Sequence, residues 1–207
     1  MNITASVSDG TSMKKLTRHD LYSLEKYAEL RPQFRSRVMA HKKNRQLAIG
    51  PHATLYFEDR LTMQYQIQEM LRIERIFEAA GVNEELAAYN PLIPDGSNWK
   101  ATFMLEFPDA AERREALTRL KGVENSVWAR VAGFGSVRPQ VDEDLERADE
   151  EKTSAVHFLR FELTSEMIQA VRQGAAIAMG IDHPDYTHRV DSLPPATRDS
   201  LAQDLIA

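Results

Sequence analysis

The side chains of this sequence that could do acid–base or metal chemistry are six histidines and a number of carboxylates. None of the histidines occurs in an HExxH, ExxH or His-x-His spacing, which are spacings that bring two metal ligands to one face of an element. A non-haem site of two histidines and one carboxylate, drawn from distant parts of the chain, stays open as one alternative. Its candidate ligands are His52, Glu58, Glu74, His157 and His183.

One of these carboxylates, Glu74, is predicted to be buried. Residues 62–80 have the periodicity of an amphipathic helix, and Gly81 is a typical residue to end it. Glu74 falls inside the apolar arc, where an unpaired carboxylate is costly. We therefore expect a partner for it, either Arg160 or a metal ion, unless Glu74 lies at the rim of the arc. The arc consists of Met63, Ile67, Met70, Leu71, Ile73 and Phe77.

The opposite face of the same helix carries a polar row. Tyr65, Glu69 and Arg72 are spaced i, i+4, i+7, and Arg75 follows them. Side chains at this spacing are neighbours on a helix surface. The row is either a solvated face or a binding surface, and together with Arg160 its members are the candidates for binding a partner protein or a small anionic ligand.

The elements that must position these residues include a weak internal repeat. Residues 103–131 and 158–181 each show a strand, a capping residue, a helix, a glycine and a second strand. Two such units in tandem predict an α+β fold with a ferredoxin-like β-α-β-β-α-β core. The first and third strands would then be adjacent and antiparallel, which leads us to expect Glu106 near Arg160.

Alternation along these strands predicts which face is buried. One face is apolar and should lie under the helices of the repeat. The other face is mixed, and we expect the N-terminal helical region to pack on it. The predicted buried residues are Phe103, Leu105, Phe107, His157, Leu159, Phe161 and Leu163.

The N-terminal half shows shorter signals. Thr17 predicts the start of a helix that runs to about Leu30, and Pro32 predicts the start of a second helix that runs to about Asn44. Residues 47–58 predict two short strands, and Asn83 predicts a short helix that ends near residue 88.

These patterns suggest a division of the chain into three parts. We expect a disordered lead-in over residues 1–13, an N-terminal helical region with short strands over 14–98, and the repeat core with a C-terminal helix over 99–207. Residues 14–207 are predicted to form one unit.

Composition excludes several classes of site. The chain has 207 residues and no cysteine, so it has no disulfide, no cysteine nucleophile and no thiolate-ligated zinc or iron–sulfur cluster. No apolar stretch approaches about 18 residues, which argues against a membrane span and a signal peptide and favours the cytoplasm.

Charge is distributed unevenly along the chain. Residues 142–151 contain seven carboxylates and one arginine, a pattern typical of a solvated loop. Residues 31–45 are basic, but the rest of the protein is acidic, so we favour a solvated helix face over a nucleic-acid-binding surface here. Strand edges in residues 47–58 could pair between two copies, which makes a homodimer one alternative.

Six ordered stretches carry a resemblance to a known family. They are residues 49–52 (IGPH), 57–58 (FE), 65–75 (YQIQEMLRIER), 89–94 (YNPLIP), 155–161 (AVHFLRF) and 182–186 (DHPDY). Through them the chain resembles an uncharacterised bacterial family, a domain of unknown function whose genes often lie beside rubrerythrin-like and iron–sulfur oxidoreductase genes. The resemblance implies an association with redox or oxidative-stress physiology, and a rubrerythrin-like or iron–sulfur protein as partner.

Two functional hypotheses follow. The preferred one is a cytoplasmic accessory protein that binds a redox partner or a small anionic ligand. The alternative is a non-haem metal-dependent enzyme that uses the His/carboxylate set. The cofactor is undetermined by the sequence, except that a thiolate-ligated cluster is excluded.

Overall fold

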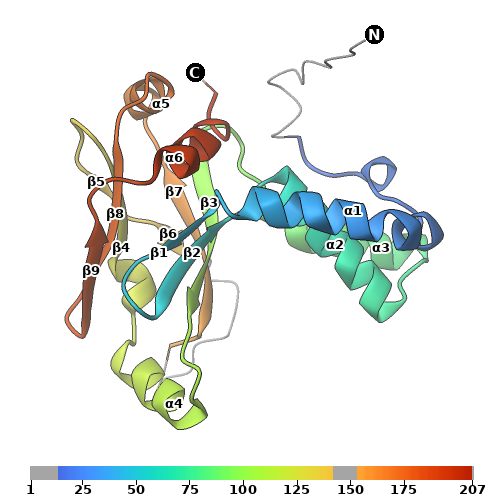
Figure 1. The fold of residues 1–207 in the computed structure, drawn as a ribbon, viewed down its shortest axis with the longest axis horizontal. Coiled ribbons are helices and arrows are strands. Elements are labelled where there is room, and N and C mark those ends of the chain that lie inside the picture. The colour runs from blue at the N-terminus through green and yellow to red at the C-terminus, as the bar shows by residue number, and fades with distance from the viewer. Residues whose placement is uncertain (1–13, 142–152, 207) are drawn as a thin grey trace.

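The helices and strands separate into a helical arm and two antiparallel sheets, as Figure 1 shows. The computed structural model describes residues 14–141 and 153–206. The lead-in expected over residues 1–13 and the acidic loop expected over residues 142–151 lie outside the described residues. The architecture is α+β, as predicted, and no helix of the described part is long and apolar enough to cross a bilayer.

The arm has small apolar cores of its own. Met63, Ile67 and Leu71 pack in a cluster with Leu86 and Ile93. The arm helices thus bury these apolar residues against one another. The arm meets the mixed sheet face at Pro91, whose carbonyl accepts from Lys100, so the expected packing on this face is confirmed only in part. The arm comprises η1 (Arg18–Asp20), α1 (Leu24–Lys42), α2 (Arg60–Glu74), α3 (Ala79–Tyr89) and η2 (Asn90–Leu92).

The two sheets share one core. The first sheet has the order β1 (Gln46–Ala48), β2 (Ala53–Phe57), β3 (Asn98–Leu105), β7 (Val156–Glu162), β6 (Gln140–Val141). The second has the order β5 (Ser136–Val137), β4 (Val127–Val131), β8 (Ile177–His183), β9 (Tyr186–Val190). Residues of both sheets meet in a single cluster that includes Phe103, Phe161 and Met179. The remaining elements are α4 (Ala110–Arg119), η3 (Val123–Ser126), α5 (Ser165–Arg172) and α6 (Pro195–Ala202).

The repeat is present, but the ferredoxin-like strand order is not confirmed. Asp109 and Thr164 cap α4 and α5, and β3 lies antiparallel to β7 as expected. In a ferredoxin-like sheet β4 would lie beside β7 and β8 beside β3. Instead β4 and β8 pair with each other in the second sheet, while β2 and β6 flank β3 and β7.

The register of β3 and β7 corrects one expected contact. Lys100 is directly opposite Arg160, because antiparallel pairing places the start of β3 against the end of β7. Glu106 follows the other end of β3, where its carboxylate accepts hydrogen bonds from Thr54 and Tyr56. The predicted proximity of Glu106 and Arg160 was therefore wrong.

The predicted faces of β3 and β7 are confirmed. All seven residues predicted to be buried are buried, and the alternate residues Thr102, Met104, Val156, Phe158 and Arg160 are only partly covered. One face of the first sheet thus packs on the shared core, and the other remains open near the arm.

Several helix boundaries differ from the prediction. A single helix, α1, runs through Pro32, and Thr17 instead caps the short turn η1. The helix α2 ends at Glu74, since Arg75 adopts a left-handed conformation with φ of 56°, and α3 already begins at Ala79. Asn83 is therefore inside α3 and does not begin it.

A tight turn joins the two sheets at one corner. Gly50 connects β1 and β2 with φ of 75°, and a β-carbon there would lie 2.6 Å from the ring of His188 and from the hydroxyl of Tyr186. The same hydroxyl donates to the carbonyl of Ile49 and accepts from the backbone N–H of His52. The turn therefore requires a residue without a side chain.

Candidate functional site

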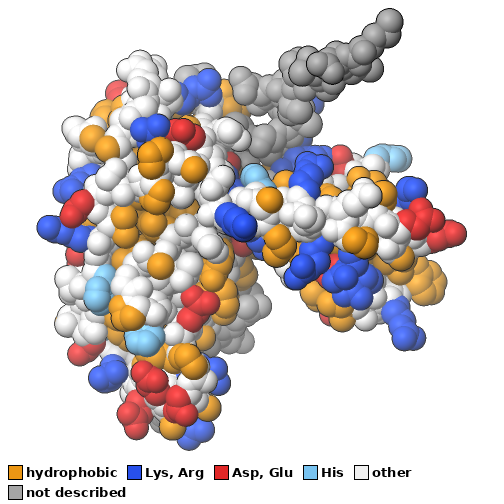
Figure 2. Space-filling model, viewed as in Figure 1, with side chains coloured by type: hydrophobic (Ala, Val, Ile, Leu, Met, Phe, Trp, Pro, Cys, Tyr) orange, Lys and Arg blue, Asp and Glu red, His pale blue; other side chains and the backbone are white. Residues whose placement is uncertain are grey.

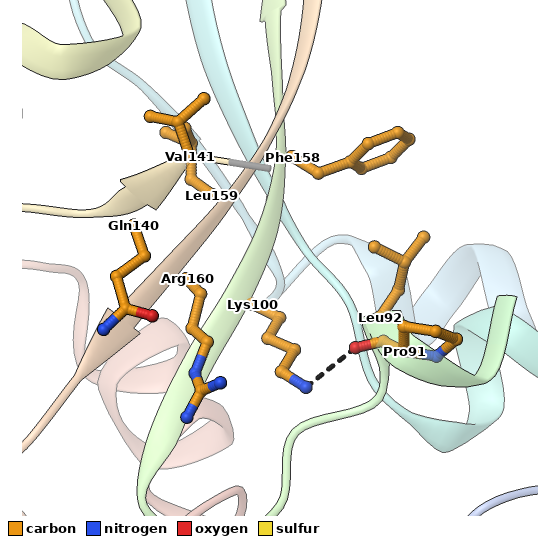
Figure 3. Close-up of a pocket in the computed structure, with 8 residues that line it drawn as sticks. All are labelled: Pro91, Leu92, Lys100, Gln140, Val141, Phe158, Leu159 and Arg160. Atoms are coloured by element: carbon orange, nitrogen blue, oxygen red, sulfur yellow. Dashed lines mark hydrogen bonds between the residues drawn. The ribbon is translucent and has the colours of Figure 1, made fainter. Parts of the chain in front are cut away.

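A pocket opens on the uncovered face of the first sheet, where β3, β6 and β7 meet η2. Its volume is about 310 Å³. Figure 3 shows the Lys100 and Arg160 side chains extending in the same direction from neighbouring strands, with η2 on the far side of Lys100. The lining residues are Pro91, Leu92, Lys100, Gln140, Val141, Phe158, Leu159 and Arg160.

Lys100 is held by backbone carbonyls. Its ammonium donates to the carbonyls of Pro91 at 2.7 Å and Ile93 at 3.0 Å, and it lies 3.7 Å from a carboxylate oxygen of Asp95. Burial lowers the pKa of Lys100; the charge of Asp95 opposes this effect and that of Arg160 adds to it. The side chain retains 11% exposure, so the group is sheltered but reachable from the pocket.

Arg160 is oriented by a carboxylate two residues further along β7. Its Nε lies 2.7 Å from Oε2 of Glu162, and one terminal nitrogen lies 2.5 Å from the same oxygen. Ser97 and Asn98 also donate to the Glu162 carboxylate. Burial acts to raise the pKa of Glu162, but these hydrogen bonds and Arg160 lower it below its usual range. Arg160 lines the pocket, and its guanidinium has N–H donors beyond those that contact Glu162.

A third cation lies beside the pocket. Lys15 donates to the carbonyls of Asn90 and Ile93, so it shares the Ile93 carbonyl with Lys100. Burial and then the positive charge of Lys100 lower the pKa of Lys15. The η2 turn that presents these carbonyls is fixed by the Asn90 side chain, which bonds both the N–H and the carbonyl of Leu16.

The polar row of α2 forms a bridge inside the arm. Glu69 accepts hydrogen bonds from the Tyr27 hydroxyl and from Arg31 of α1, and also from Arg72. The hydrogen bond from Arg31 is the largest influence on Glu69 and brings its pKa to about 2, against the opposing effect of burial. Burial and the Glu69 bond raise the pKa of Tyr27.

The other members of the row lie elsewhere in the arm. Tyr65 packs its ring against Phe34, with centroids 6.1 Å apart, and Arg75 is exposed at the end of α2. None of the four row residues lines the pocket that contains Arg160. Of the predicted binding residues, Arg160 therefore lines the pocket, whereas the four residues of the polar row lie in the arm.

Glu74 does not need the partner that was expected. It is exposed at the last position of α2, and so are its neighbours Ile73 and Phe77 in the expected arc. The prediction of a buried carboxylate was wrong because the helix ends before its apolar face closes over this position.

The other candidate metal ligands are satisfied separately. Glu58 is buried and accepts from the hydroxyls of Thr62 and Thr102. His157 is buried beside Thr153 and Ser154, and burial lowers its pKa against the opposing charge of Glu124.

His52 stacks on Phe107 and contacts the Glu106 carbonyl, while His183 uses one ring nitrogen on the Lys121 carbonyl and the other on the Asp185 N–H. The structure does not bring His52, Glu58, Glu74, His157 and His183 together. Within residues 14–141 and 153–206, no group of three or more His, Asp or Glu side chains is arranged to hold a metal ion.

A buried ionic cluster lies where the arm joins the sheets, and no sequence signal pointed to it. Arg45 is 2% exposed, contacts Asp204 at 2.6 Å and Asp59 at 3.4 Å, and donates to the carbonyls of Phe57 and Glu58. His41 lies 2.5 Å from Asp59. Burial acts to raise the pKa of Asp59, but His41 and Arg45 lower it to about 2. In the sequence Arg45 reads only as part of a basic run.

Three basic residues of the 31–45 run face solvent. Arg35, Arg37 and Lys43 are exposed, and Figure 2 shows Lys and Arg side chains spread over the arm surface. Arg31 and Arg45 are engaged by carboxylates. The basic run is thus divided between solvent and internal ion pairs.

Sequence reasoning placed Arg160 among the binding residues but missed Lys15, Lys100 and Gln140. The signal that could have revealed Lys100 was the position at which the strand begins. If the strand that contains residues 103–107 is extended back to Asn98, antiparallel pairing places Lys100 opposite Arg160.

Comparisons with known proteins give a family but no activity. Residues 15–205 match the family described as "Protein of unknown function (DUF3501)". A crystal structure titled as a novel protein of unknown function from Burkholderia pseudomallei K96243 is 50% identical, covers 93% of this chain and 100% of its own, and has a TM-score of 0.89. Among curated proteins, none matches the chain. Neither description names a ligand, reaction or partner, so the expected redox partner stays a prediction.

Proposed function

Because the chain belongs to the DUF3501 family of proteins of unknown function, we propose a function from the pocket itself: an accessory protein that binds a small anionic ligand. The observation that carries this proposal is the presence of Lys100 and Arg160 together in the wall of a 310 Å³ pocket, with Lys15 bonded to the same carbonyl as Lys100.

The charge at this place favours an anion. Three cations face two carboxylates, Asp95 and Glu162, which leaves an excess of one positive charge. Burial is the main cause of the lowered pKa values of Lys15 and Lys100, and the positive charges of their neighbours lower these values further, so the cations also repel one another. A bound anion would relieve this repulsion in a partly desolvated setting, where charge-assisted hydrogen bonds are strong.

The rest of the pocket defines the other end of the ligand. Leu92, Val141 and Phe158 contribute apolar surface beside the cations. Pockets of this size that combine apolar side chains with a few convergent polar groups are typical of small-molecule sites. The proposed ligand class is therefore a carboxylate or phosphate monoester that bears a small apolar group.

Calorimetric titration with 3-phenylpropionate, benzoate and inorganic phosphate tests the proposal. We expect saturable binding of the two carboxylates, with phosphate weaker because it lacks the apolar group. Arg160→Gln should weaken carboxylate binding about tenfold, which corresponds to the loss of one charge-assisted hydrogen bond.

A matched control is available on β9. Arg189 pairs with Asp191 two residues further on, just as Arg160 pairs with Glu162, but it lies in the second sheet. Arg189→Gln should leave the affinity unchanged. Equal losses in the two variants, or no saturable binding by the wild type, would contradict the proposal.

A further inference from the structure

The hydrogen bonds of Lys100 leave its nitrogen suited to a second role. A neutral amine has two N–H donors and one lone pair. Two carbonyls, those of Pro91 and Ile93, lie within 3.0 Å of Nζ and can take both hydrogens. The third contact, to a carboxylate oxygen of Asp95 at 3.7 Å, is the longest of the three, and the third proton of the ammonium is the one that Asp95 can take.

Burial also favours the neutral amine. It is the largest effect on the pKa of Lys100 and lowers it; the charge of Arg160 adds to this effect, while the charge and hydrogen bond of Asp95 and the charge of Glu162 oppose it. Each unit by which an amine pKa falls raises the fraction of free base about tenfold at neutral pH. Sheltered lysines near another cation are the ones that proteins use as amine nucleophiles.

Arg160 lies at the right place to orient a carbonyl compound. Residues directly opposite in antiparallel strands have β-carbons about 5 Å apart, and Lys100 and Arg160 form such a pair. A carboxylate bound by the guanidinium would place the adjacent carbon of the ligand near Nζ. In a 2-oxo acid that carbon is a ketone or aldehyde carbon.

We propose that Lys100 forms a reversible imine with a 2-oxo acid whose carboxylate is held by Arg160, an inference that rests on the proposed anion site. The amine lone pair of Nζ forms a bond to the carbonyl carbon, and the carbonyl π electrons move to oxygen, which takes a proton from nitrogen. The resulting hydroxyl leaves as water with a second proton while the C=N bond forms. Starting from the ammonium form, the products are one protonated imine and one water.

Asp95 is the nearest proton acceptor for this step. Its carboxylate is held by Ser97 and Asn98 and faces the ammonium of Lys100. It is positioned to take the proton that the ammonium must lose before attack and to return it when water leaves. No oxidant, reductant or metal ion is required.

The experiment is imine trapping with phenylpyruvate and cyanoborohydride on the full chain, read by intact mass and peptide mapping. We expect one reduced adduct per chain, located on Lys100, at a rate about tenfold above that of the exposed Lys26. Lys100→Arg keeps the charge and should abolish the adduct, while Lys26→Arg should leave it unchanged.

Phenyllactate separates this inference from the anion site. It carries a hydroxyl in place of the ketone, so it should bind with an Arg160-dependent affinity and give no adduct. Phenyllactate binding without any phenylpyruvate adduct on Lys100 would overturn the imine and leave the anion site intact, whereas absence of both would overturn both. Modification of Lys15 in place of Lys100, or of all exposed lysines alike, would also overturn the imine. Peptide mapping of the wild type decides these outcomes even if Lys100→Arg fails to fold.

Discussion

Lys100 and Arg160 meet because two strands far apart in the sequence run in opposite directions. The pairing of β3 and β7 could be predicted from the repeat, and Arg160 was already a candidate because a partner was expected for Glu74. Lys100 was missed because the apolar residues 103–107 suggested a strand that began too late. A shift of a few residues in a strand boundary thus hid half of the candidate site.

Lys100 was a site residue that the prediction missed, whereas Glu74 was predicted to be buried and is exposed. Helical periodicity placed it among apolar neighbours, yet Ile73 and Phe77 are 62% and 76% exposed. Periodicity describes an infinite helix and does not say where the helix stops or which part of an arc has something to pack against. The sequence contained no strong stop signal at Arg75, which is the only described non-glycine residue with a positive φ.

The Glu69 cluster gives a prediction about acid stability. The ionised Glu69 carboxylate stabilises the folded state, because its pKa there is about 2, below the usual value for a glutamate. This stabilisation is fully present above about pH 4.5. It is lost as the pH falls from there toward 2, since protonation removes the bonds to Arg31 and Arg72. Glu69→Gln should lower the free energy of unfolding at pH 7 by about 1–2 kcal/mol and flatten its decline in acid. Urea denaturation from pH 7 to 2.5 measures both effects.

An exposed glutamate on α1 serves as the control. Glu29 pairs with Lys26 at the surface, where its side chain is 64% exposed. Glu29→Gln should change the free energy of unfolding by less than about 0.5 kcal/mol at either pH. If both variants followed the same pH curve, the Glu69 cluster would not stabilise the arm.

At the scale of elements, local signals located the elements of the repeat, but they did not determine how all of its strands pair. The capped helices α4 and α5, the strands β4 and β8 and the two strands of residues 47–58 all occur where their caps, glycines and strand-forming residues predicted them. The predicted neighbour of β4 was β7, and this prediction was wrong, because a buried strand with apolar residues can pair in either sheet. The local composition of β4 does not indicate whether β7 or β8 lies beside it.

The helix α1 illustrates how tertiary contacts override a local rule. Pro32 predicted a boundary, since a proline removes one backbone hydrogen bond and crowds the preceding turn. Residues of α1 on both sides of Pro32 form one buried cluster, and Leu61 and Tyr65 of α2 pack against it. The buried residues are Tyr27, Phe34 and Val38. Their burial holds one continuous helix across the proline.

The corner between the sheets gives a prediction for the Gly50 turn. Gly50→Ala places a methyl group against His188 and Tyr186 in addition to straining a positive φ. Gly133→Ala is the matched control, because φ is 88° there and no atom lies within 4 Å of the added carbon. We expect Gly50→Ala to lower the free energy of unfolding by about 1–3 kcal/mol more than Gly133→Ala, as measured by urea denaturation. Equal effects would mean that the turn does not pack on β9.

At the scale of the whole molecule, the ionic cluster of Arg45, Asp59 and Asp204 connects the arm, the first sheet and the C-terminal segment. Asp204→Asn removes the closer of the two carboxylates that pair with Arg45 and leaves the buried guanidinium with the longer contact to Asp59, so it should lower the free energy of unfolding by about 3 kcal/mol. The double variant Arg45→Met, Asp204→Leu should lose less, because it removes both charges of the closest pair. Urea denaturation of the two variants tests this, and a larger loss in the double variant would contradict it.

The pocket depends on this arrangement of the whole molecule, since η2 of the arm and β3, β6 and β7 of the first sheet each supply part of its wall. The most direct measurement is an anomalous difference map from a crystal soaked in 4-bromobenzoate. The account predicts a bromine peak among Leu92, Val141 and Phe158, with the carboxylate between Lys100 and Arg160. Ordered ligand bound only elsewhere on the protein, with the pocket filled by water alone, would contradict it.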